Sequence, residues 1–332
     1  MTCQEWTRER LFDLSIAHRS FCAFHAGLQL RIFTIIGDEN LTAHEIALKC
    51  EASSRGITML LDALAAMNIL KKHPDKTYAN SQAAASFLIE GTQDYIGYMS
   101  IFFNSLLTAW TELPKAVRTG SPVMTNAPFG DEIMREHFLM GMFSMSMSSA
   151  PQIARQINLS QRKHLLDLGG GPGTHAIHFC RQNPALRATI FDLKTTRPIA
   201  ERVLDQFEMR HRIEFLGGNY LDDPFGGPYD VVWISKVLPN EGRQKCQHVI
   251  NKAVSAMESG GIILIHDYMV NPLGDGPLSP ALFALEMLVQ SDEGRVYSEK
   301  DYTEMLHNAG VKDVKRLPYR GPGDTGILSG IL

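Results

Sequence analysis

The residues with the clearest potential for chemistry are the glycines and the acid within residues 165–174, which read LLDLGGGPGT. The apolar start is typical of a buried strand, and a glycine-rich turn that leads from a strand into a helix is a common ligand site. Gly169, Gly171 and Gly173 permit backbone angles and close approaches that a Cβ would oppose. The same glycines would also suit a simple tight turn, so the loop alone does not establish a ligand.

The details of this loop favour a cationic ligand over a dinucleotide. The dinucleotide pattern G-x-G-x-x-G places glycine where this chain has Thr174, and Pro172 removes an amide that would bind a pyrophosphate. Asp167, at the end of the expected strand, would repel a pyrophosphate and attract a cation. Asp192 follows Gly169 by 23 residues, at the end of the next expected strand, where a carboxylate can accept hydrogen bonds from two ribose hydroxyls. Together the two acids fit a ligand with a ribose and a positive charge.

These motifs resemble those of the S-adenosylmethionine (SAM)-dependent small-molecule O-methyltransferases of plants and bacteria, which include hydroxyindole, caffeate, carotenoid and bacteriochlorophyll enzymes. The family's motif D-x-G-G-G-x-G corresponds to residues 167–173 and its ribose-binding acid to Asp192, and the resemblance runs from about Leu11 to the C-terminus. It implies an α/β fold, with a Rossmann-like SAM-methyltransferase domain that has a mixed seven-stranded sheet, preceded by a mostly helical, winged-helix-like domain. It also implies SAM as cofactor and S-adenosylhomocysteine (SAH) as product.

The resemblance implies further cofactor contacts at the ends of later strands. The family's G-D-x-x element appears as residues 218–221, so Asn219 stands where the family has an acid that meets the adenine amino group, and an amide oxygen can still accept that bond. Lys236 stands in the motif L-x-R-x-L-H where the family has a cofactor-binding arginine. The expected cofactor-binding residues are Asp167, Gly169, Gly171, Gly173, Asp192, Asn219, Tyr220 and Lys236.

The chain departs from the family at the residue that removes the proton from the acceptor hydroxyl. This residue is a histidine in the family and Pro239 here, and the acid that orients it in the plant enzymes aligns near Val296. Three explanations stay open: an acceptor that needs no strong base, such as an electron-rich carbon; a base at another position; or SAM binding without ordinary methyl transfer. The candidate catalytic residues are His137, Asn240 and Asp267, although helix packing and loop capping explain His137 and Asp267 at least as well.

The chain contains 15 methionines, and some of them are candidates for contact with the acceptor. Residues 138–142, FLMGM, correspond to the family's F-x-x-(A/G)-M element, which contacts cofactor and substrate. Phe138, Met142 and, on a later helix, Met287 are the candidate substrate-binding residues, in an adaptable apolar wall for a flat or elongated hydrophobic acceptor. Packing at a domain or subunit contact explains the methionines equally well. His175, just after the glycine loop, is expected either to meet the cofactor's carboxylate or to begin a helix.

Alternating strands and helices are expected to position these residues. Strand-like segments begin at His164 and recur as ATIFDL, RIEFL, YDVVWIS and GGIILIHDY, each followed by a polar or amphipathic stretch, which predicts an open parallel sheet covered by helices. The last two candidates, VKDVKRLP and TGILSGIL, predict a terminal hairpin on that sheet. Residues 92–160 are expected to form further helices.

The first 90 or so residues predict a helix-turn-helix followed by a small hairpin. Thr42 and Glu45 have the spacing of a capping box, and the apolar residues from Ile57 to Met67 follow helical spacing. Only Arg55 is basic at the start of the second helix, and residues 1–100 contain 9 basic and 11 acidic side chains, so DNA binding is disfavoured. We expect a winged-helix-like dimerisation domain at 1–100, a helical linker that lines the active site at 101–160, and a SAM-binding domain at 161–332.

Length, charge and cysteine content exclude several classes of protein. A chain of 332 residues suits two domains, and a net charge of −4 gives no general attraction to nucleic acid or anionic membrane. The five cysteines have no metal-ligand spacing, so we expect reduced thiols, no metal, and a cytoplasmic location without a membrane span. The expectation is a homodimeric methyltransferase for a small, hydrophobic or aromatic acceptor, at oxygen or carbon. The alternatives are a SAM-responsive dimeric regulator and an NAD-linked dehydrogenase on the same sheet.

Overall fold

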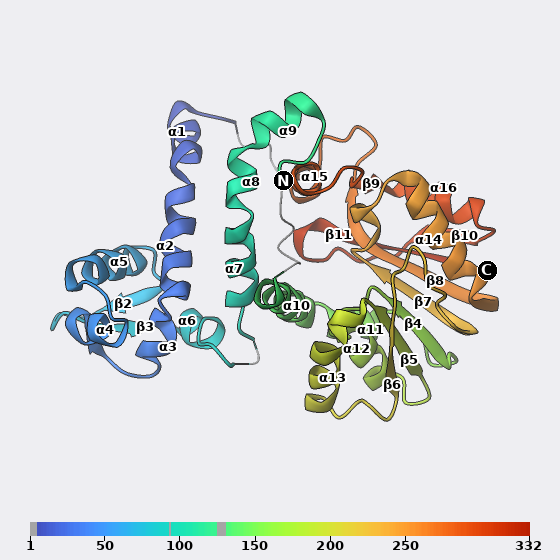
Figure 1. The fold of residues 1–332 in the computed structure, drawn as a ribbon, viewed down its shortest axis with the longest axis horizontal. Helices are drawn as coiled ribbons and strands as arrows, with labels where there is room; N and C mark the ends of the chain where they lie inside the picture. The colour runs from blue at the N-terminus through green and yellow to red at the C-terminus, as the bar shows by residue number, and fades with distance from the viewer. Residues whose placement is uncertain (1–4, 93, 125–130) are drawn as a thin grey trace. The chain divides into compact units, whose positions relative to one another are not determined.

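The structure, a computed structural model, describes residues 5–92, 94–124 and 131–332 and divides the chain into two units, 1–105 and 106–332 (Figure 1). The first unit is mainly helical, with a small antiparallel sheet. The domain limits 1–100, 101–160 and 161–332 remain predictions. The elements of the first unit are α1 (Arg8–Ile16), α2 (His18–Gln29), α3 (Ile32–Ile36), β1 (Leu41–Thr42), α4 (Ala43–Lys49), α5 (Ser54–Ala66), β2 (Leu70–Lys72), β3 (Thr77–Asn80), α6 (Gln82–Phe87) and α7 (Gly97–Ser105).

The helix-turn-helix and hairpin of the first unit are confirmed. Thr42 caps α4, and the side chain of Glu45 accepts a hydrogen bond from the Thr42 backbone in return, so that both partners of the capping box are present. The next helix, α5, buries Ile57, Leu61 and Leu64 on one side. Strands β2 and β3 form the hairpin, and β1 pairs with β3 on its other edge.

The second unit alternates strands and helices. Its helices are α8 (Leu107–Thr111), α9 (Leu113–Thr119), α10 (Glu132–Met147), α11 (Ala150–Gln156), α12 (Thr174–Gln182), α13 (Arg197–Gln206), α14 (Arg243–Ser255), α15 (Leu278–Gln290) and α16 (Glu299–Asn308). Its strands are β4 (His164–Leu168), β5 (Arg187–Asp192), β6 (Ile213–Gly217), β7 (Tyr229–Ser235), β8 (Met257–Val270), β9 (Tyr297–Ser298), β10 (Lys312–Arg316) and β11 (Thr325–Ile331). Short 3-10 turns lie at η2 (Lys194–Thr196), η3 (Leu238–Asn240) and η4 (Pro322–Asp324).

Seven of these strands form the predicted mixed sheet, in the order β10–β11–β8–β7–β4–β5–β6, and the short β9 pairs with β8 beside this path. Strands β4 to β8 run parallel, whereas β11 is antiparallel to both β8 and β10. The terminal hairpin predicted from the sequence is therefore confirmed. No helix in the described ranges is long and apolar enough to cross a membrane.

A hydrophobic core lies on each face of this sheet. Successive strand residues point to opposite faces, so Val232 packs with one core and Trp233 with the other. Helices α14 and α16 contribute to the core that contains Val232, and α11, α12 and α13 to the core that contains Trp233. The central strands β4, β5 and β7 are buried on both faces, which explains their nearly continuous apolar sequences.

The order of the strands creates a crevice at one point of the sheet. From β4 the chain proceeds outward through β5 to β6, and it then returns to place β7 on the other side of β4. In open α/β sheets the loops that follow the two strands at such a reversal diverge, and ligands bind there, beyond the carboxyl ends of the strands. The loops after β4 and β7 are therefore the expected position of the site.

Candidate active site

A cavity of about 480 Å³ opens at this reversal of strand order. The sheet register shows how its wall is arranged: Leu168, the last residue of β4, lies opposite Phe191 of β5 and Ile234 of β7. The next residues, Gly169, Asp192 and Ser235, all line the cavity. Asp192 and Ser235 thus lie on the two sides of the glycine loop.

The glycine loop has the backbone conformation that glycine permits. The φ angles of Gly169, Gly171 and Gly173 are +65°, +52° and +86°. Gly169 and Gly171 line the cavity, as the sequence predicted. Gly173 does not; a Cβ there would lie 2.4 Å from Cδ1 of Ile190, so this glycine lets α12 pack closely on the sheet.

Asp167 lies beneath the loop and reaches the cavity wall. One oxygen, Oδ2, accepts a hydrogen bond from the Ala176 backbone at 3.1 Å, and Oδ1 has no hydrogen-bond partner among the described residues. Burial raises the pKa of Asp167 to about 7, because the ionised carboxylate is poorly solvated there. A donor or cation in the cavity would satisfy Oδ1 and stabilise the ionised form.

Asp192 is held in place by three donors. Its Oδ2 accepts from the Gly171 backbone at 2.8 Å, and its Oδ1 accepts from the Leu193 backbone at 2.7 Å and from the Thr196 hydroxyl at 2.9 Å. Burial raises the pKa of the Asp192 carboxyl, and the hydrogen bonds from these three donors act in the opposite direction. The carboxylate therefore has a fixed position next to the glycine loop, with lone pairs still available to a ligand.

Lys236 lines the cavity on the side of β7. Its φ is +59°, an unusual value for a residue with a side chain, and its backbone N–H donates to the carbonyl of His266 at 3.0 Å. Burial lowers the pKa of Lys236, whereas the nearby carboxylate of Asp267 acts in the opposite direction. The ammonium group also lies 5.8 Å from the centre of the Tyr268 ring.

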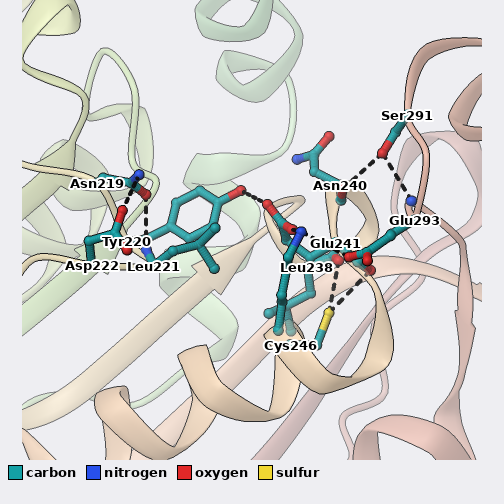
Figure 2. Close-up of polar contacts among 12 residues, drawn as sticks. Asn219, Tyr220, Leu221, Asp222, Leu238, Asn240, Glu241, Cys246, Ser291 and Glu293 are labelled. Carbon is teal, nitrogen blue, oxygen red and sulfur yellow. Dashed lines mark hydrogen bonds and ion pairs between the residues drawn. The ribbon is translucent and has the colours of Figure 1, made fainter.

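Tyr220 lines the cavity, but its neighbour Asn219 does not. The Tyr220 hydroxyl donates to Oε1 of Glu241 at 2.8 Å (Figure 2). The side chain of Asn219 is used locally: Oδ1 accepts from the Leu221 backbone at 2.9 Å, and Nδ2 donates to Asp222 at 2.8 Å. This local turn explains why Asn219 lies outside the cavity wall.

The turn that contains Pro239 presents Val237 and Asn240 to the cavity, while Pro239 itself is buried and does not line it. Several bonds hold this turn. The Pro239 carbonyl accepts from the Arg295 backbone at 2.8 Å, and the Asn240 carbonyl accepts from the Ser291 hydroxyl at 3.2 Å (Figure 2). Asn240 is therefore the polar side chain that this turn offers to a ligand.

Helix α10 forms the apolar part of the wall. The cavity is lined from this helix by Arg135, Phe138, Leu139, Met142 and Ser146, a spacing that defines one helical side. Phe138 and Met142 were predicted to contact the acceptor, and both line the cavity.

Besides Gly173 and Asn219, three more of the predicted residues do not line the cavity. His137 lies on another side of α10, Met287 is buried in α15, and Asp267 is fully buried at the end of β8. The structure therefore does not bring the proposed alternative bases His137 and Asp267 to the cavity.

Sequence reasoning missed several polar residues of the wall, among them Arg135, Ser235 and Thr196, and left the role of His175 open. All four line the cavity. Ser235 and Thr196 each follow or end a recognisable strand or turn, so their place at strand ends was the available signal. Burial lowers the pKa of His175 to about 3, which keeps its ring neutral.

Comparison with known proteins decides the family. The model of the O-methyltransferase domain matches residues 110–312, and the model of the O-methyltransferase dimerisation domain matches residues 12–90. The chain belongs to the O-methyltransferase family. It is thus a SAM-dependent methyltransferase that acts on small molecules and converts SAM to SAH.

Known members agree with this assignment. The chain is 29% identical to the 3-hydroxy-5-methyl-1-naphthoate 3-O-methyltransferase of Streptomyces sahachiroi, over 92% of this chain and 90% of that protein. It is 28% identical to the tetracenomycin polyketide synthesis 8-O-methyl transferase TcmO of Streptomyces glaucescens, over 96% and 95% of the two chains. Human N-acetylserotonin methyltransferase, solved in complex with SAM, has the same fold, with a TM-score of 0.88 at 23% identity and coverage of 100% and 99%.

The residues of the cavity fit SAM. The half-satisfied carboxylate of Asp167 suits a cationic ligand, the fixed carboxylate of Asp192 suits ribose hydroxyls, and the ammonium of Lys236 suits a carboxylate. Gly171 leaves room at the centre of the loop, because the nearest atom to a Cβ there would be Cδ2 of Leu139 at 3.6 Å.

Proposed function

We propose that this methyltransferase transfers the SAM methyl group to a small, hydrophobic or aromatic acceptor without a histidine base from the protein. The observation that carries the proposal is the turn after β7, where Pro239 replaces the histidine that the family resemblance implies and Asn240 is the polar residue directed to the cavity. When SAM is bound, its sulfonium supplies an electrophilic methyl group for direct transfer to the acceptor.

The residues of the cavity have separate tasks in this proposal. Asp192 binds the ribose hydroxyls, and Tyr220, held by Glu241, packs at the nucleoside. Gly169 and Gly171 let the ligand approach the backbone closely. Lys236 binds the carboxylate of the amino-acid part. Neither Asn219 nor Gly173 has a direct role, because neither lines the cavity.

The acceptor side is proposed to bind flat, apolar molecules. Phe138 and Met142 face the cavity from α10, and methionine adapts to ligands of different shape. The names of the two Streptomyces relatives, a naphthoate and a polyketide methyltransferase, suggest hydroxylated aromatic compounds as acceptors. Orientation of such a ring against the methyl group would supply much of the rate enhancement.

The proton of the acceptor is proposed to leave without help from an ionisable side chain of the β7 turn. Asn240 has no basic group, so it can only orient a hydroxyl by hydrogen bonding. Two classes of acceptor satisfy this condition: an acidic phenol that ionises in solution, and an electron-rich carbon that loses its proton after methyl transfer. The acceptor is therefore methylated at oxygen or at carbon according to its own chemistry.

A methyl-transfer assay tests this proposal. The enzyme is incubated with SAM that carries a trideuterated methyl group and with a panel of hydroxynaphthoates, hydroxyquinones and enolic β-dicarbonyl compounds, and the products are identified by mass spectrometry and NMR. We expect labelled product from acidic phenols or enols. Tight SAH binding without transfer to any class would favour the alternative, a SAM-responsive protein that has lost methyl transfer, for which Pro239 is also the supporting observation.

The first unit is proposed to form a homodimer. It contains the dimerisation domain, and α1 has no buried residue while Leu11, Phe12 and Leu14 are exposed on it. Light scattering of the full chain should give twice the monomer mass.

The thiols of Cys22, Cys50, Cys180 and Cys246 are free, which is compatible with the cytoplasmic location that we also propose.

A further inference from the structure

The loop that carries Tyr220 is held from behind by a lysine of α14. Nζ of Lys252 donates to the carbonyls of Tyr220, Leu221 and Asp223 at 3.0, 3.1 and 2.9 Å. An ammonium group has three N–H donors and no acceptor, and a carbonyl can only accept, so the direction of these bonds is fixed and each donor has a partner. Lys252 therefore uses its whole hydrogen-bonding capacity on the main chain of this loop.

Further contacts from α14 support the same arrangement. Nζ of Lys252 lies 4.6 Å from the centre of the Phe225 ring, and Phe225 is buried. One helical turn before Lys252, Nε2 of His248 lies 3.0 Å from the Leu221 carbonyl, which can only accept a hydrogen bond. The helix thus holds the loop at several points along its main chain.

The loop presents one residue to the cavity. Of residues 218–225, all of which the structure describes, only Tyr220 lines the cavity. Its hydroxyl donates to Glu241, whose side chain is only 14% exposed (Figure 2). Tyr220 is therefore fixed at both ends, by the turn after β7 at its hydroxyl and by α14 at its main chain. A side chain held in this way loses little conformational freedom when a ligand packs against it.

We infer that Lys252 is a positioning residue for the cofactor, because it holds the main chain of residues 220–223 so that the Tyr220 ring faces the nucleoside. This inference rests on the proposed binding mode, in which Tyr220 packs at the nucleoside. Lys252 does not line the cavity, so its effect on binding passes through the loop. Without the ammonium group three carbonyls lose their donor, and the ligand then has to order the loop as it binds.

Calorimetry on the full chain tests this inference with SAH and with 5′-methylthioadenosine, which share the nucleoside. Lys252→Met removes the ammonium group and keeps an unbranched side chain. We expect it to weaken both ligands by the same factor, roughly 3- to 10-fold, the effect of ordering a side chain and its loop on binding. Lys252→Arg keeps the charge and several donors, so its loss should be smaller, and it provides the same test if Lys252→Met does not fold.

Arg243→Met is the matched control on the same helix. The guanidinium of Arg243 pairs with Asp301 at 2.6 Å and with Glu304 at 2.7 Å, both on α16. This variant also removes a cation and its bonds from α14, but at a position that does not hold the loop. Urea unfolding of both variants measures their stability, and we expect SAH affinity to fall only in Lys252→Met.

A double-mutant cycle tests whether Lys252 acts through Tyr220. In Tyr220→Ala the ring is absent, so the addition of Lys252→Met should not weaken SAH any further. A purely structural role of Lys252 in the loop would not make its effect on affinity depend on the Tyr220 ring.

The results that overturn the inference differ from those that overturn the proposed function. Unchanged SAH affinity in Lys252→Met, a loss for SAH without a loss for 5′-methylthioadenosine, an equal loss in Arg243→Met, or a full further loss in the Tyr220→Ala background would each contradict the positioning role. Unchanged SAH affinity in Tyr220→Ala alone, or failure of the unmodified protein to bind SAH, would instead contradict the proposed function.

Discussion

Asp192 is the residue on which the proposed cofactor site depends most. Its two oxygens are already oriented by Gly171, Leu193 and Thr196, so little further ordering is needed when ribose binds. We expect Asp192→Ala to weaken SAM binding by about 1–3 kcal/mol, the loss of charge-assisted hydrogen bonds. Calorimetric titration with SAM measures this. An unchanged dissociation constant would remove Asp192 from the site.

Asp267 affects the stability of the fold and not ligand binding, because it is buried outside the cavity. Burial raises the pKa of Asp267 to about 7, whereas the pKa of an aspartate in an unfolded chain is about 4. The folded state therefore holds more protons between these values, and the free energy of unfolding falls as pH rises through this range. We expect Asp267→Asn to be more stable than the unmodified protein at pH 8, by about 1–3 kcal/mol, and the gap to be smaller at pH 5.

Urea unfolding at the two pH values checks this prediction. The other titratable groups are the same in the two proteins, so the change in the gap reports the titration of Asp267 together with its electrostatic effect on Lys236. A gap that does not depend on pH would show that the carboxylate is better solvated than its burial indicates.

At the scale of elements, the loop between β4 and α12 combines two kinds of glycine. Gly173 has φ +86°, and a Cβ would collide with Ile190, whereas Gly171 has φ +52° and ordinary space at the cavity wall. We expect Gly173→Ala to lower the free energy of unfolding by more than the roughly 1–2 kcal/mol that a left-handed residue alone costs. Gly171→Ala should be the milder change for stability and the more harmful one for SAH binding.

Denaturant titration and calorimetry on the same two variants measure both effects. The reverse order, with Gly171→Ala the less stable protein and SAH binding lost mainly in Gly173→Ala, would mean that the two glycines have been assigned the wrong roles.

The strands of the sheet were predictable because most of them are apolar segments separated by polar or amphipathic stretches. Their order in the sheet was not predicted, because it depends on contacts between segments that are distant in the chain. The glycine loop and Asp192 were predictable because both stand directly at strand ends. Arg135 was not, because no local pattern tells which side of a helix faces a cavity, whereas Ser235 ends β7 and its signal was overlooked. The place of Asn219 outside the cavity wall was not predictable, because its amide closes a local turn with Leu221 that the sequence motif does not reveal.

At the scale of the whole molecule, family membership and the residue at position 239 support different expectations about how the acceptor loses its proton. The chain matches the model of the O-methyltransferase domain, and Pro239 stands where we propose that relatives have a histidine base. Of the described ionisable residues that line the cavity, we propose that Asp167, Asp192 and Lys236 contact the cofactor, and His175, whose pKa is lowered to about 3, is too weak a base near neutral pH. We therefore propose that the acceptor loses its proton through its own acidity.

The pH dependence of methyl transfer tests this claim most directly. Two phenolic acceptors of similar shape and different acidity are compared by measuring kcat/KM over the pH range in which the enzyme is stable. Because the phenolate is the reactive form, the account predicts that kcat/KM rises with pH and levels off at the pKa of each acceptor, so that the two profiles are displaced by the difference between their pKa values. Identical profiles for both acceptors would show that a group of the enzyme removes the proton, and they would contradict the account.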